Sequence, residues 1–379
     1  MKNLILYAYP PEADGQSLQG DFLRKGILEA GEEAIPCHFK ESYQKEFYLK
    51  YGKPDVAFGI GFWGNVPDVI IEPLKHGVTP VPWFNADGWI ANYKKEFNDL
   101  DLMFTTSSWV KDLYRRDGID VSKIIPMHIG IDTGMFKPLN NTASNNGIRK
   151  MLGINETDKI IMTIGGDTTS KGSQEMMRAL AEVNKEFKNW KYICKSWPSG
   201  CSREWREKEI ELAEELGITD HMIFIEDEFT PEFMVLLLNA ADIYAAPSRI
   251  EGFGMIQVEA MSCGKPVISI NKMGPGETIL HNKTGLLAEV AEEVQLSEEW
   301  AFKHMGFTKK HLVKFDHPKT FAYRADVNDL REHTLKLLSD DSLRETMGNQ
   351  AREHVLKNFD YRDIAKRMLA ITKEKLNIE

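Results

Sequence analysis

The sequence predicts an α/β protein with two doubly wound domains, each a parallel sheet with helices on both faces, that face each other across a cleft. The chain has 379 residues, 42% of them hydrophobic, which is enough for two cores and too apolar for a disordered protein. Short apolar stretches alternate with helical intervals along most of the chain, a pattern typical of parallel sheets. A polar segment at 137–148, rich in Asn and Ser, has the composition of an interdomain linker.

The N-terminal domain is expected to span 1–145. It opens with a short apolar strand at 4–9, a turn marked by Pro and Gly, and a helix at 22–30. Further short apolar or β-branched strands are predicted at 55–60, 80–84, 102–105 and 123–127. This succession of strands and helices predicts a Rossmann-like sheet.

The C-terminal domain is expected to span 149–360 and to repeat the same plan. Its strands are predicted at 160–164, 191–195, 222–225, 243–246 and 266–270, with a helix at 173–187 after the first strand. The tail has helical spacing, and its last amphipathic helix, at about 361–379, is free to pack back on the N-terminal domain. Two doubly wound halves in one chain predict a ligand held in the cleft between them.

Composition excludes several classes of function. The formal net charge of −10 argues against binding of DNA or RNA. The four cysteines form no C-x-x-C pair, so neither a zinc site nor a disulfide framework is expected, and no carboxylate cluster indicates magnesium. No apolar run reaches the ~18 residues of a membrane-spanning helix. A cytoplasmic protein without metal or other cofactor is therefore expected.

The segment 243–270 carries the most specific chemical signal. A predicted strand runs into a loop with two glycines, Gly252 and Gly254, and then into a helix. Free N–H groups and the positive end of the helix dipole suit a phosphate. Glu251 and Glu259 lie eight residues apart, up to ~12 Å along a helix axis, about the span between two sugars across a diphosphate. Because carboxylates accept hydrogen bonds from hydroxyls, the pattern favours a nucleotide diphosphate sugar. A solvated helix with two acidic residues is the alternative.

The run 240–287 resembles the donor-site pattern of retaining glycosyltransferases of family four, which have the two-domain GT-B architecture. The likeness includes Gly-Pro-Gly-Glu at 274–277 and Asn-Lys-Thr-Gly at 282–285. It implies that Glu251 binds hydroxyls of the transferred sugar and that Glu259 binds the ribose of the nucleotide. It further implies that backbone amides of the loop hold the diphosphate, at Gly252, Phe253, Gly254 and Met255.

A second glycine loop, 163–172, also follows a predicted strand and opens a helix. Lys171 matches the lysine that relatives use against the donor phosphate, and Gly166 lies in the same loop. A positive charge there would stabilise the leaving diphosphate. The family usually has an arginine shortly before this lysine, which this loop lacks, so Lys195 or Arg203 is expected to replace it. A surface lysine in the first turn of a helix is the alternative for Lys171.

In the N-terminal domain, the resemblance extends to candidates for the acceptor side. Asp87 falls where many relatives have a His-Asp pair near the reacting sugar, while Asn85 replaces the histidine. His128 lies in a stretch, 125–138, that resembles the family's segment before the linker; a packed or capping histidine is the alternative. Gly15 lies in the first strand–helix turn, where relatives place a glycine loop against the donor.

Residues 288–325 follow neither the family pattern nor the alternation of strands and helices. Within them, 303–319 holds five lysines against one aspartate, together with apolar side chains. On an acidic protein this composition suggests contact with an anionic lipid, and hence peripheral membrane association, or with an acidic acceptor. A solvated insertion with one face on the core is the alternative.

The resemblance thus implies a metal-independent retaining hexosyltransferase that moves a sugar from a UDP-, GDP- or ADP-type donor to a sugar, lipid or small-molecule acceptor. Glu251, Lys171 and Asp87 are the expected catalytic residues. The residues expected to bind the donor are Gly15, Gly166, Lys171, Lys195, Glu251, Gly252, Phe253, Gly254, Met255 and Glu259. The alternatives are a GT-B nucleotide-sugar epimerase or phosphorylase, and a non-catalytic nucleotide-sugar-binding protein.

Overall fold

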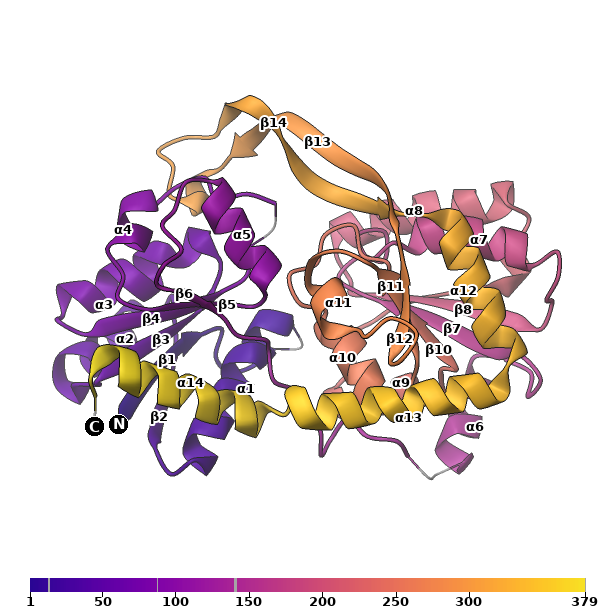
Figure 1. Ribbon diagram of the computed structural model, residues 1–379, viewed down its shortest axis with the longest axis horizontal. Coiled ribbons are helices and arrows are strands. Elements are labelled where there is room, and N and C mark those ends of the chain that lie inside the picture. Colours follow the sequence, from indigo (N-terminus) through magenta and orange to yellow (C-terminus); the bar gives the residue numbers. More distant parts are fainter. Residues whose placement is uncertain (13, 87, 140–141, 379) are drawn as a thin grey trace. The chain divides into compact units, whose positions relative to one another are not determined.

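The chain forms two compact units, and each is a doubly wound α/β domain (Figure 1). The structure, a computed structural model, describes all residues except 13, 87, 140–141 and 379. Unit 1 consists of 1–132, 295–321 and 359–379, and unit 2 consists of 133–294 and 322–358. None of the described helices has the length and apolar run that crossing a bilayer requires.

Unit 1 is built on a six-stranded parallel sheet in the order β2-β1-β3-β4-β5-β6. Its strands are β1 (Lys2–Tyr7), β2 (Glu33–His38), β3 (Val56–Gly61), β4 (Thr79–Phe84), β5 (Met103–Thr105) and β6 (Ile124–Pro126). Its helices are α1 (Gly15–Glu29), α2 (Ser42–Phe47), α3 (Glu72–Lys75), α4 (Lys94–Asn98), α5 (Ser108–Arg116) and α14 (Tyr361–Leu376). Strand β3 is buried along its whole length, as expected where helices cover both faces of a parallel sheet.

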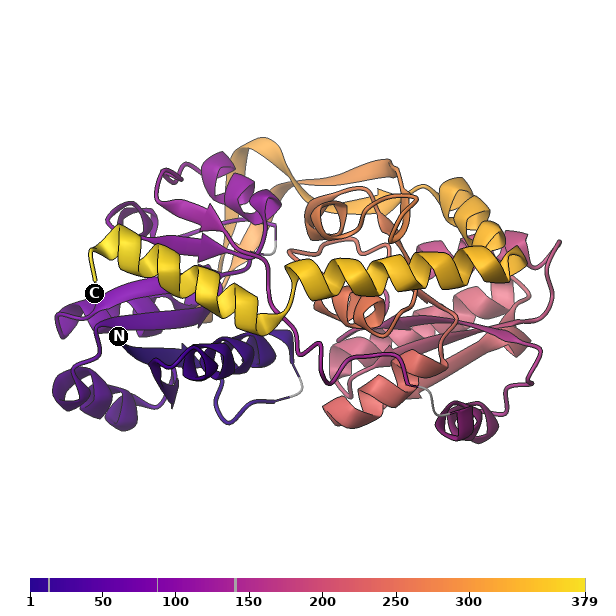
Figure 2. The same ribbon diagram turned by 60° about the horizontal axis from the view of Figure 1, so that its bottom comes forward.

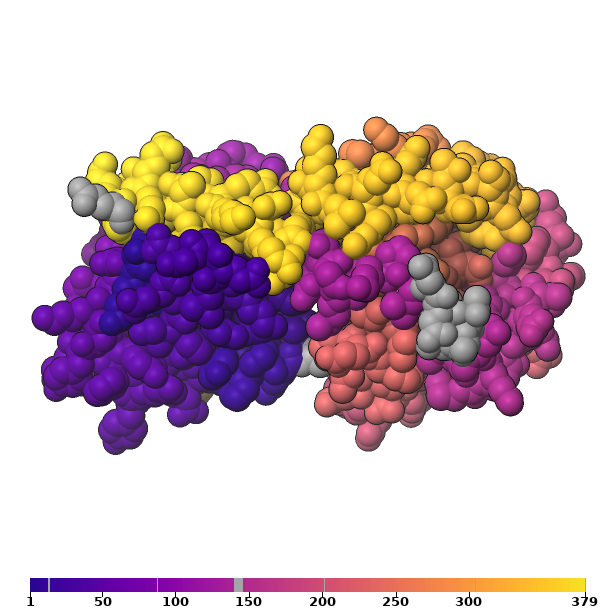
Figure 3. Space-filling model, turned by 90° about the horizontal axis from the view of Figure 1, so that it is seen from below, coloured from indigo at the N-terminus to yellow at the C-terminus, as the bar shows by residue number. Residues whose placement is uncertain are grey.

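The C-terminal helix α14 packs on α1 within unit 1. In Figure 3 its yellow atoms lie along the indigo surface of the first residues. Gly26 allows this close approach, because a Cβ there would stand 2.5 Å from the Cβ of Ala365. The rings of Phe22 and Tyr361 stack with centroids 5.7 Å apart. The last helix thus belongs to the N-terminal unit.

Unit 2 is built on a second six-stranded parallel sheet, in the order β12-β11-β10-β7-β8-β9. Its strands are β7 (Lys159–Ile164), β8 (Trp190–Ser196), β9 (Met222–Glu226), β10 (Ile243–Ala245), β11 (Val267–Ile270) and β12 (Gly285–Ala288). Its helices are α6 (Thr142–Met151), α7 (Ser173–Val183), α8 (Gly200–Glu215), α9 (Pro231–Ala240), α10 (Met255–Ser262), α11 (Met273–Thr278), α12 (Val327–Ser339) and α13 (Asp341–Asn358). Figure 2 shows these helices around the sheet.

The segment predicted as a linker, 137–148, contains the start of a helix instead. Helix α6 runs from Thr142 to Met151 and packs on α9. Its last turns are held in place by Ile148, which is buried, and by Arg149, which lies 2.9 Å from Asp242. The boundary between the units falls earlier, between Asp132 and Thr133. The polar composition of the segment is typical of a linker and gave no indication of this short helix.

The insertion at 288–325 forms a two-stranded sheet of its own, β13 (Val290–Ala301) and β14 (His311–Ala325). Its residues 295–321 belong to unit 1, although the sequence assigned them to the C-terminal domain. The reason is aromatic packing: Trp89 contacts Phe315 and Phe321 with ring centroids 5.3 and 6.1 Å away. Apolar side chains of the insertion therefore pack on the core of unit 1.

Candidate active site

The loops that carry the strongest candidates leave neighbouring strands of unit 2. Strands β7 and β10 pair in the middle of the sheet, and from them the chain winds outward in opposite directions, to β9 and to β12. Doubly wound sheets bind their ligands at the carboxyl end of such a switch point. Lys171 follows β7 and Glu251 follows β10, so both lie at this position.

Lys171 and Glu251 form an ion pair. The Nζ atom of Lys171 lies 2.7 Å from Oε2 of Glu251, and the two side chains are 24% and 15% exposed. The other carboxylate oxygen of Glu251 accepts a hydrogen bond from the backbone N–H of Gly254 at 3.0 Å. The amide that the sequence assigned to a diphosphate therefore contacts Glu251 in this structure. Both oxygens of the carboxylate are held in place.

The loop before α10 is shaped by close backbone contacts. Gly254 precedes the helix with a φ of +94°, a conformation that favours glycine. Gly274, in α11, donates its N–H to the carbonyl of Glu251 at 3.0 Å. A Cβ at Gly274 would stand 2.5 Å from Cα of Phe253, so α11 lies directly against the loop. The first N–H groups of α10 have no intrahelical acceptor and can receive an anion.

Glu259 lies about one turn into α10 and is buried. Its residue is only 4% exposed, and burial raises the pKa of its carboxyl to about 8. A buried carboxyl with a raised pKa is characteristic of functional sites, because it gains from a ligand that donates hydrogen bonds to it. The ribose hydroxyls of a nucleotide would do so.

Hydrogen bonds to Glu209 hold the loop that carries Lys171. Glu209 is a residue of α8 that sequence reasoning missed. Its carboxylate accepts hydrogen bonds from the hydroxyls of Thr168, at 2.8 Å, of Thr169, also at 2.8 Å, and of Ser173. Glu209 is 1% exposed. Nothing in the sequence distinguishes it from the other acidic residues of an amphipathic helix, since its three partners lie in a distant loop.

Glycines make room around Lys171. A Cβ at Gly165 would stand 2.5 Å from Cγ of Lys171, and one at Gly172 would stand 2.3 Å from the carbonyl oxygen of Pro247. By contrast, a Cβ at Gly166 would meet no atom within 4 Å. The backbone at Gly166 therefore borders open space, and its contact with a ligand stays a prediction.

Arg249 connects the two loops. Its backbone N–H donates to the carbonyl of Ser170 at 2.9 Å, and its guanidinium pairs with Glu175 at 2.9 Å. The sequence pattern alone indicates no role for this arginine. In the structure it fixes the register between the loops of Lys171 and Glu251.

Lys195 lies at the end of β8, next to β7. Its ammonium is buried, has no hydrogen-bond partner among the described residues, and lies 3.7 Å from the ring centroid of Trp197. Burial lowers the pKa of Lys195 to about 8, against the charges of Asp227 and Glu228. The other candidate for the missing arginine, Arg203, is largely exposed and pairs with Glu226. Lys195 is thus the better placed of the two.

The remaining candidates lie in unit 1. Gly15 is the first residue of α1, next to the helix cap Asp14. His128 is half-buried, and its ring centroid is 5.6 Å from that of Phe359. Asp87 lies outside the described residues, while Asn85 accepts a hydrogen bond from the Thr106 hydroxyl. Within the described part of the chain, no three His, Cys, Asp or Glu side chains are grouped to hold a metal ion.

Comparison with known proteins finds a family model that matches the part of the chain with these loops. Residues 144–301 match the family Glycosyl transferases group 1. The matched segment contains the charged candidates of unit 2, which are Lys171, Lys195, Arg203, Glu251 and Glu259.

Curated glycosyltransferases are similar to more than half of the chain. The chain is 29% identical over 230 residues, 60% of its length, to D-inositol 3-phosphate glycosyltransferase of Rhodococcus jostii, and covers 48% of that protein. It is 28% identical over 217 residues, 57% of its length, to the Mycolicibacterium smegmatis protein of the same name, of which it covers 47%. The chain thus spans about half the length of these relatives.

Solved structures confirm the GT-B fold. Sucrose-phosphate synthase from Thermosynechococcus elongatus superposes with a TM-score of 0.73 at 17% identity, over 100% of both chains. HepE of Anabaena, in complex with UDP and glucose, has a TM-score of 0.73 at 15% identity, over 99% of this chain and 100% of that one. A glycosyltransferase from Rickettsia africae has a TM-score of 0.75 at 17% identity, over 100% of both chains.

Proposed function

We propose that the protein is a glycosyltransferase that moves a sugar from a UDP-, GDP- or ADP-type nucleotide sugar to an acceptor. The observation that carries this proposal is the ion pair of Lys171 and Glu251 at the switch point of unit 2. Both residues lie in the segment that matches the family Glycosyl transferases group 1. The relatives named as glycosyltransferases, and the likeness to HepE in complex with UDP and glucose, support a nucleotide-sugar donor.

The donor would be held by groups that are already in position. Its diphosphate would lie against the start of α10 and the open side of Gly166, with the charge of Lys171 beside it. As the phosphate takes over Lys171, Glu251 becomes free to accept hydrogen bonds from hydroxyls of the sugar. Glu259 would accept hydrogen bonds from the ribose. The ion pair thus holds both side chains in the positions where they would contact the donor.

The transfer itself would proceed with retention at the sugar carbon. The bond from this carbon to the diphosphate breaks, and the acceptor oxygen bonds to the same face of the sugar. The acceptor proton passes to the departing phosphate oxygen, so no protein nucleophile is needed. Lys171 and the helix N–H groups would stabilise the charge that develops on the leaving diphosphate. Because these groups supply positive charge, we propose a metal-independent reaction, whose rate a chelator such as EDTA leaves unchanged.

Unit 1 would supply the acceptor side. Asp87 and His128 are the proposed acceptor-side residues, and Gly15 the proposed contact of this unit with the donor. Asp87→Ala, His128→Ala and Gly15→Val should each reduce transfer. Binding of the free nucleoside diphosphate to unit 2 should stay intact in all three variants. A sugar, a lipid or another small molecule would fit as acceptor.

A non-catalytic nucleotide-sugar binder is the second candidate. It is favoured by the lack of an arginine between Gly165 and Asp167 and by Asn85 in place of a histidine. Calorimetric binding of a donor, without transfer to any member of a broad acceptor panel, would support the binder. The related GT-B reactions are distinguished by incubating the protein with donor alone, for epimerisation, and with phosphate and a disaccharide, for phosphorolysis.

The direct test starts with a thermal-shift screen of nucleotide diphosphate sugars, since a ligand that binds the native state raises the melting temperature. The best donor, labelled in its sugar, is then used in transfer assays with the wild type and Glu251→Ala. We expect the variant to fold normally and to lose transfer. Glu182→Ala removes an exposed carboxylate of the same unit and should retain it. Full turnover by Glu251→Ala would refute the assignment of the site.

A further inference from the structure

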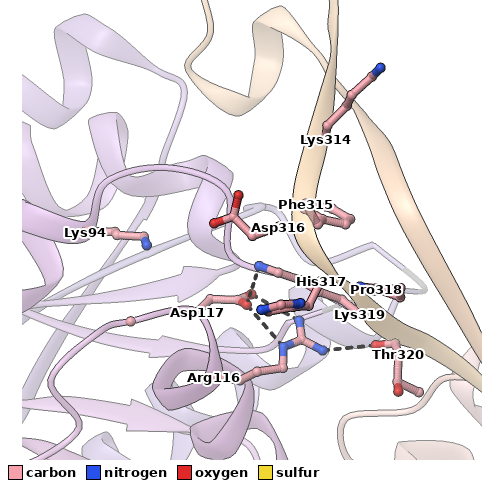
Figure 4. Close-up of a pocket in the computed structure, with 11 residues that line it drawn as sticks. Lys94, Arg116, Asp117, Lys314, Phe315, Asp316, His317, Pro318, Lys319 and Thr320 are labelled. Atoms are coloured by element: carbon pink, nitrogen blue, oxygen red, sulfur yellow. Dashed lines mark hydrogen bonds and ion pairs between the residues drawn. The ribbon is translucent and has the colours of Figure 1, made fainter.

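A cavity lies within unit 1, among residues that the proposed function does not use. It has a volume of about 600 Å³. Three segments line it: Lys94 at the start of α4, residues 116–118 at the end of α5, and residues 314–320 of β14 (Figure 4). The insertion that departs from the family pattern thus forms one side of the cavity.

The lining carries more positive than negative charge, although the chain as a whole has a net charge of −10. The cationic side chains are Lys94, Arg116, Lys314 and Lys319, and the acidic ones are Asp117 and Asp316. In Figure 4, Lys314 points away from the other cations. A local excess of positive charge in a concave site raises the concentration of anions there.

Asp117 does not cancel this excess, because two cations already bind it. Its side chain is 1% exposed and lies 3.1 Å from a guanidinium nitrogen of Arg116 and 2.7 Å from Nζ of Lys319. Its second oxygen also accepts the backbone N–H of Ile90 at 2.7 Å. One carboxylate with two cations leaves a net positive group at the base of the cavity.

Lys94 also lines the cavity. No carboxylate among the described residues lies within ion-pair distance of it. Its Nζ atom lies over Gly118, where a Cβ would stand 3.2 Å away. The ammonium therefore offers its N–H donors to an incoming group in the cavity.

We propose that this cavity binds the phosphate group of a phosphomonoester. A phosphomonoester carries about −1.5 to −2 charges near neutral pH, and it offers three acceptor oxygens to the ammonium groups of Lys94 and Lys319. Asp316, also in the lining, disfavours a polyanion and accepts a hydrogen bond from a hydroxyl. The phosphate is accordingly attached to a hydroxylated molecule, either a free metabolite or the headgroup of a lipid.

Occupancy of the cavity would also stabilise the backbone at 88–90. Arg116 donates to the carbonyl of Gly88, and Asp117 accepts from Ile90. A phosphate that holds Lys319 and Arg116 in place strengthens both contacts. Slower hydrogen exchange of the Ile90 amide on addition of ligand is therefore expected.

The test compares Lys94→Glu with Lys95→Glu in the full chain. Both lysines are exposed and neighbours in α4, but only Lys94 lines the cavity. Calorimetry with glycerol 3-phosphate and with inorganic phosphate should show saturable binding to the wild type, at least about tenfold weaker in Lys94→Glu and little changed in Lys95→Glu. Equal weakening in the two variants, at matched melting temperatures, would overturn the proposal.

A second arm separates the sources of the phosphate. Flotation with phosphatidylcholine vesicles, with and without phosphatidic acid, is measured for the same variants. Binding of soluble phosphate that depends on Lys94 identifies a free ligand, whereas Lys94-dependent binding to phosphatidic acid vesicles alone identifies a headgroup. Absence of both would refute the site, and would leave the donor site untouched because Lys94 has no part in it.

Asp316→Asn provides an independent check. Removing this carboxylate removes its repulsion, so inorganic phosphate should bind a few-fold more tightly. An affinity that stays the same or falls would show that phosphate does not lie beside Asp316, and would contradict the proposal.

Discussion

Lys171 and Glu251 form an ion pair of 2.7 Å in unit 2, although 80 residues separate them in the sequence. The pair joins the loop after β7 to the loop after β10, at the point where the sheet changes its winding direction. Since each partner also has a role toward the proposed donor, substitutions of the two residues should have different consequences.

Lys171→Met should reduce the turnover number by about a hundredfold or more, since it removes a charge that acts mainly on the leaving diphosphate. The KM for the donor should change much less, because backbone N–H groups still hold the ground-state phosphate. Steady-state kinetics with the donor found by thermal shift would measure both parameters. Lys185→Met, at an exposed lysine of the same unit, is the control. A rise in KM alone would mean that Lys171 only binds the substrate.

Glu259→Gln should stabilise the protein at alkaline pH while weakening nucleotide binding. Burial raises the pKa of this carboxyl in the folded state to about 8, above its ordinary value near 4.5. The unfolded state therefore binds fewer protons between these values, and the free energy of unfolding falls as pH rises through this range. The amide removes the cost of ionisation, on the order of a few kcal/mol above pH 8.

Urea unfolding at pH 5 and pH 9 checks this expectation. The wild type should lose more stability than Glu259→Gln between the two pH values, and Glu182→Gln should behave like the wild type. An equal loss in all three proteins would show that Glu259 does not carry the raised pKa. Calorimetry with nucleoside diphosphates measures the loss of the ribose contact.

The sequence predicted those parts of the site that depend on short-range patterns. The glycine loops at 165–172 and 252–254 follow strands and precede helices as expected, and the structure brings Lys171 and Glu251 together. The contribution of Glu209 could not be predicted, because its hydroxyl partners meet it only through the packing of α8 near α7. The two carboxylates differ in this respect: Glu251 has a local motif, whereas Glu209 has none.

Packing between residues that are distant in the sequence also explains why the domain boundary was predicted at another position. Residues 295–321 are nearest in sequence to unit 2, and their lysines suggested a solvated or lipid-facing segment. Their position in unit 1 depends on the stacking of Phe315 on Phe321, with ring centroids 5.7 Å apart, and on their contacts with Trp89. The contacts with Trp89 join residues more than 200 positions apart, and contacts of this kind leave no periodicity in the sequence.

Nucleotide binding should depend on the protonation of Lys195. Its pKa is lowered to about 8 by burial, so the ammonium loses its charge as pH rises from 7 to 9. The affinity for a nucleoside diphosphate should fall over this range in the wild type. Lys195→Arg keeps its charge and should therefore show a profile that differs from that of the wild type by the contribution of Lys195, while Lys195→Met should bind weakly throughout. Identical pH profiles for the wild type and Lys195→Arg would exclude this lysine from the donor site.

Glu209→Ala should lower the turnover number through the loop that carries Lys171. The substitution leaves the buried hydroxyls of Thr168, Thr169 and Ser173 without their acceptor, which costs about 1–3 kcal/mol for each unsatisfied group, reduced by relaxation of the loop. A total loss of about 2–4 kcal/mol is therefore expected in urea unfolding. Glu207→Ala, at an exposed position of the same helix, should lose less than about 0.5 kcal/mol.

Kinetics separate a positioning role of Glu209 from a merely structural one. Glu209→Gln keeps an oxygen that accepts hydrogen bonds from the hydroxyls, so it should recover most of the turnover number lost in Glu209→Ala. If Glu209 positions Lys171, combining Glu209→Ala with Lys171→Met should lower turnover little further than Lys171→Met alone, because the loop then has no charge left to misplace. Fully additive losses in the double variant would show that Glu209 stabilises unit 2 without acting through Lys171.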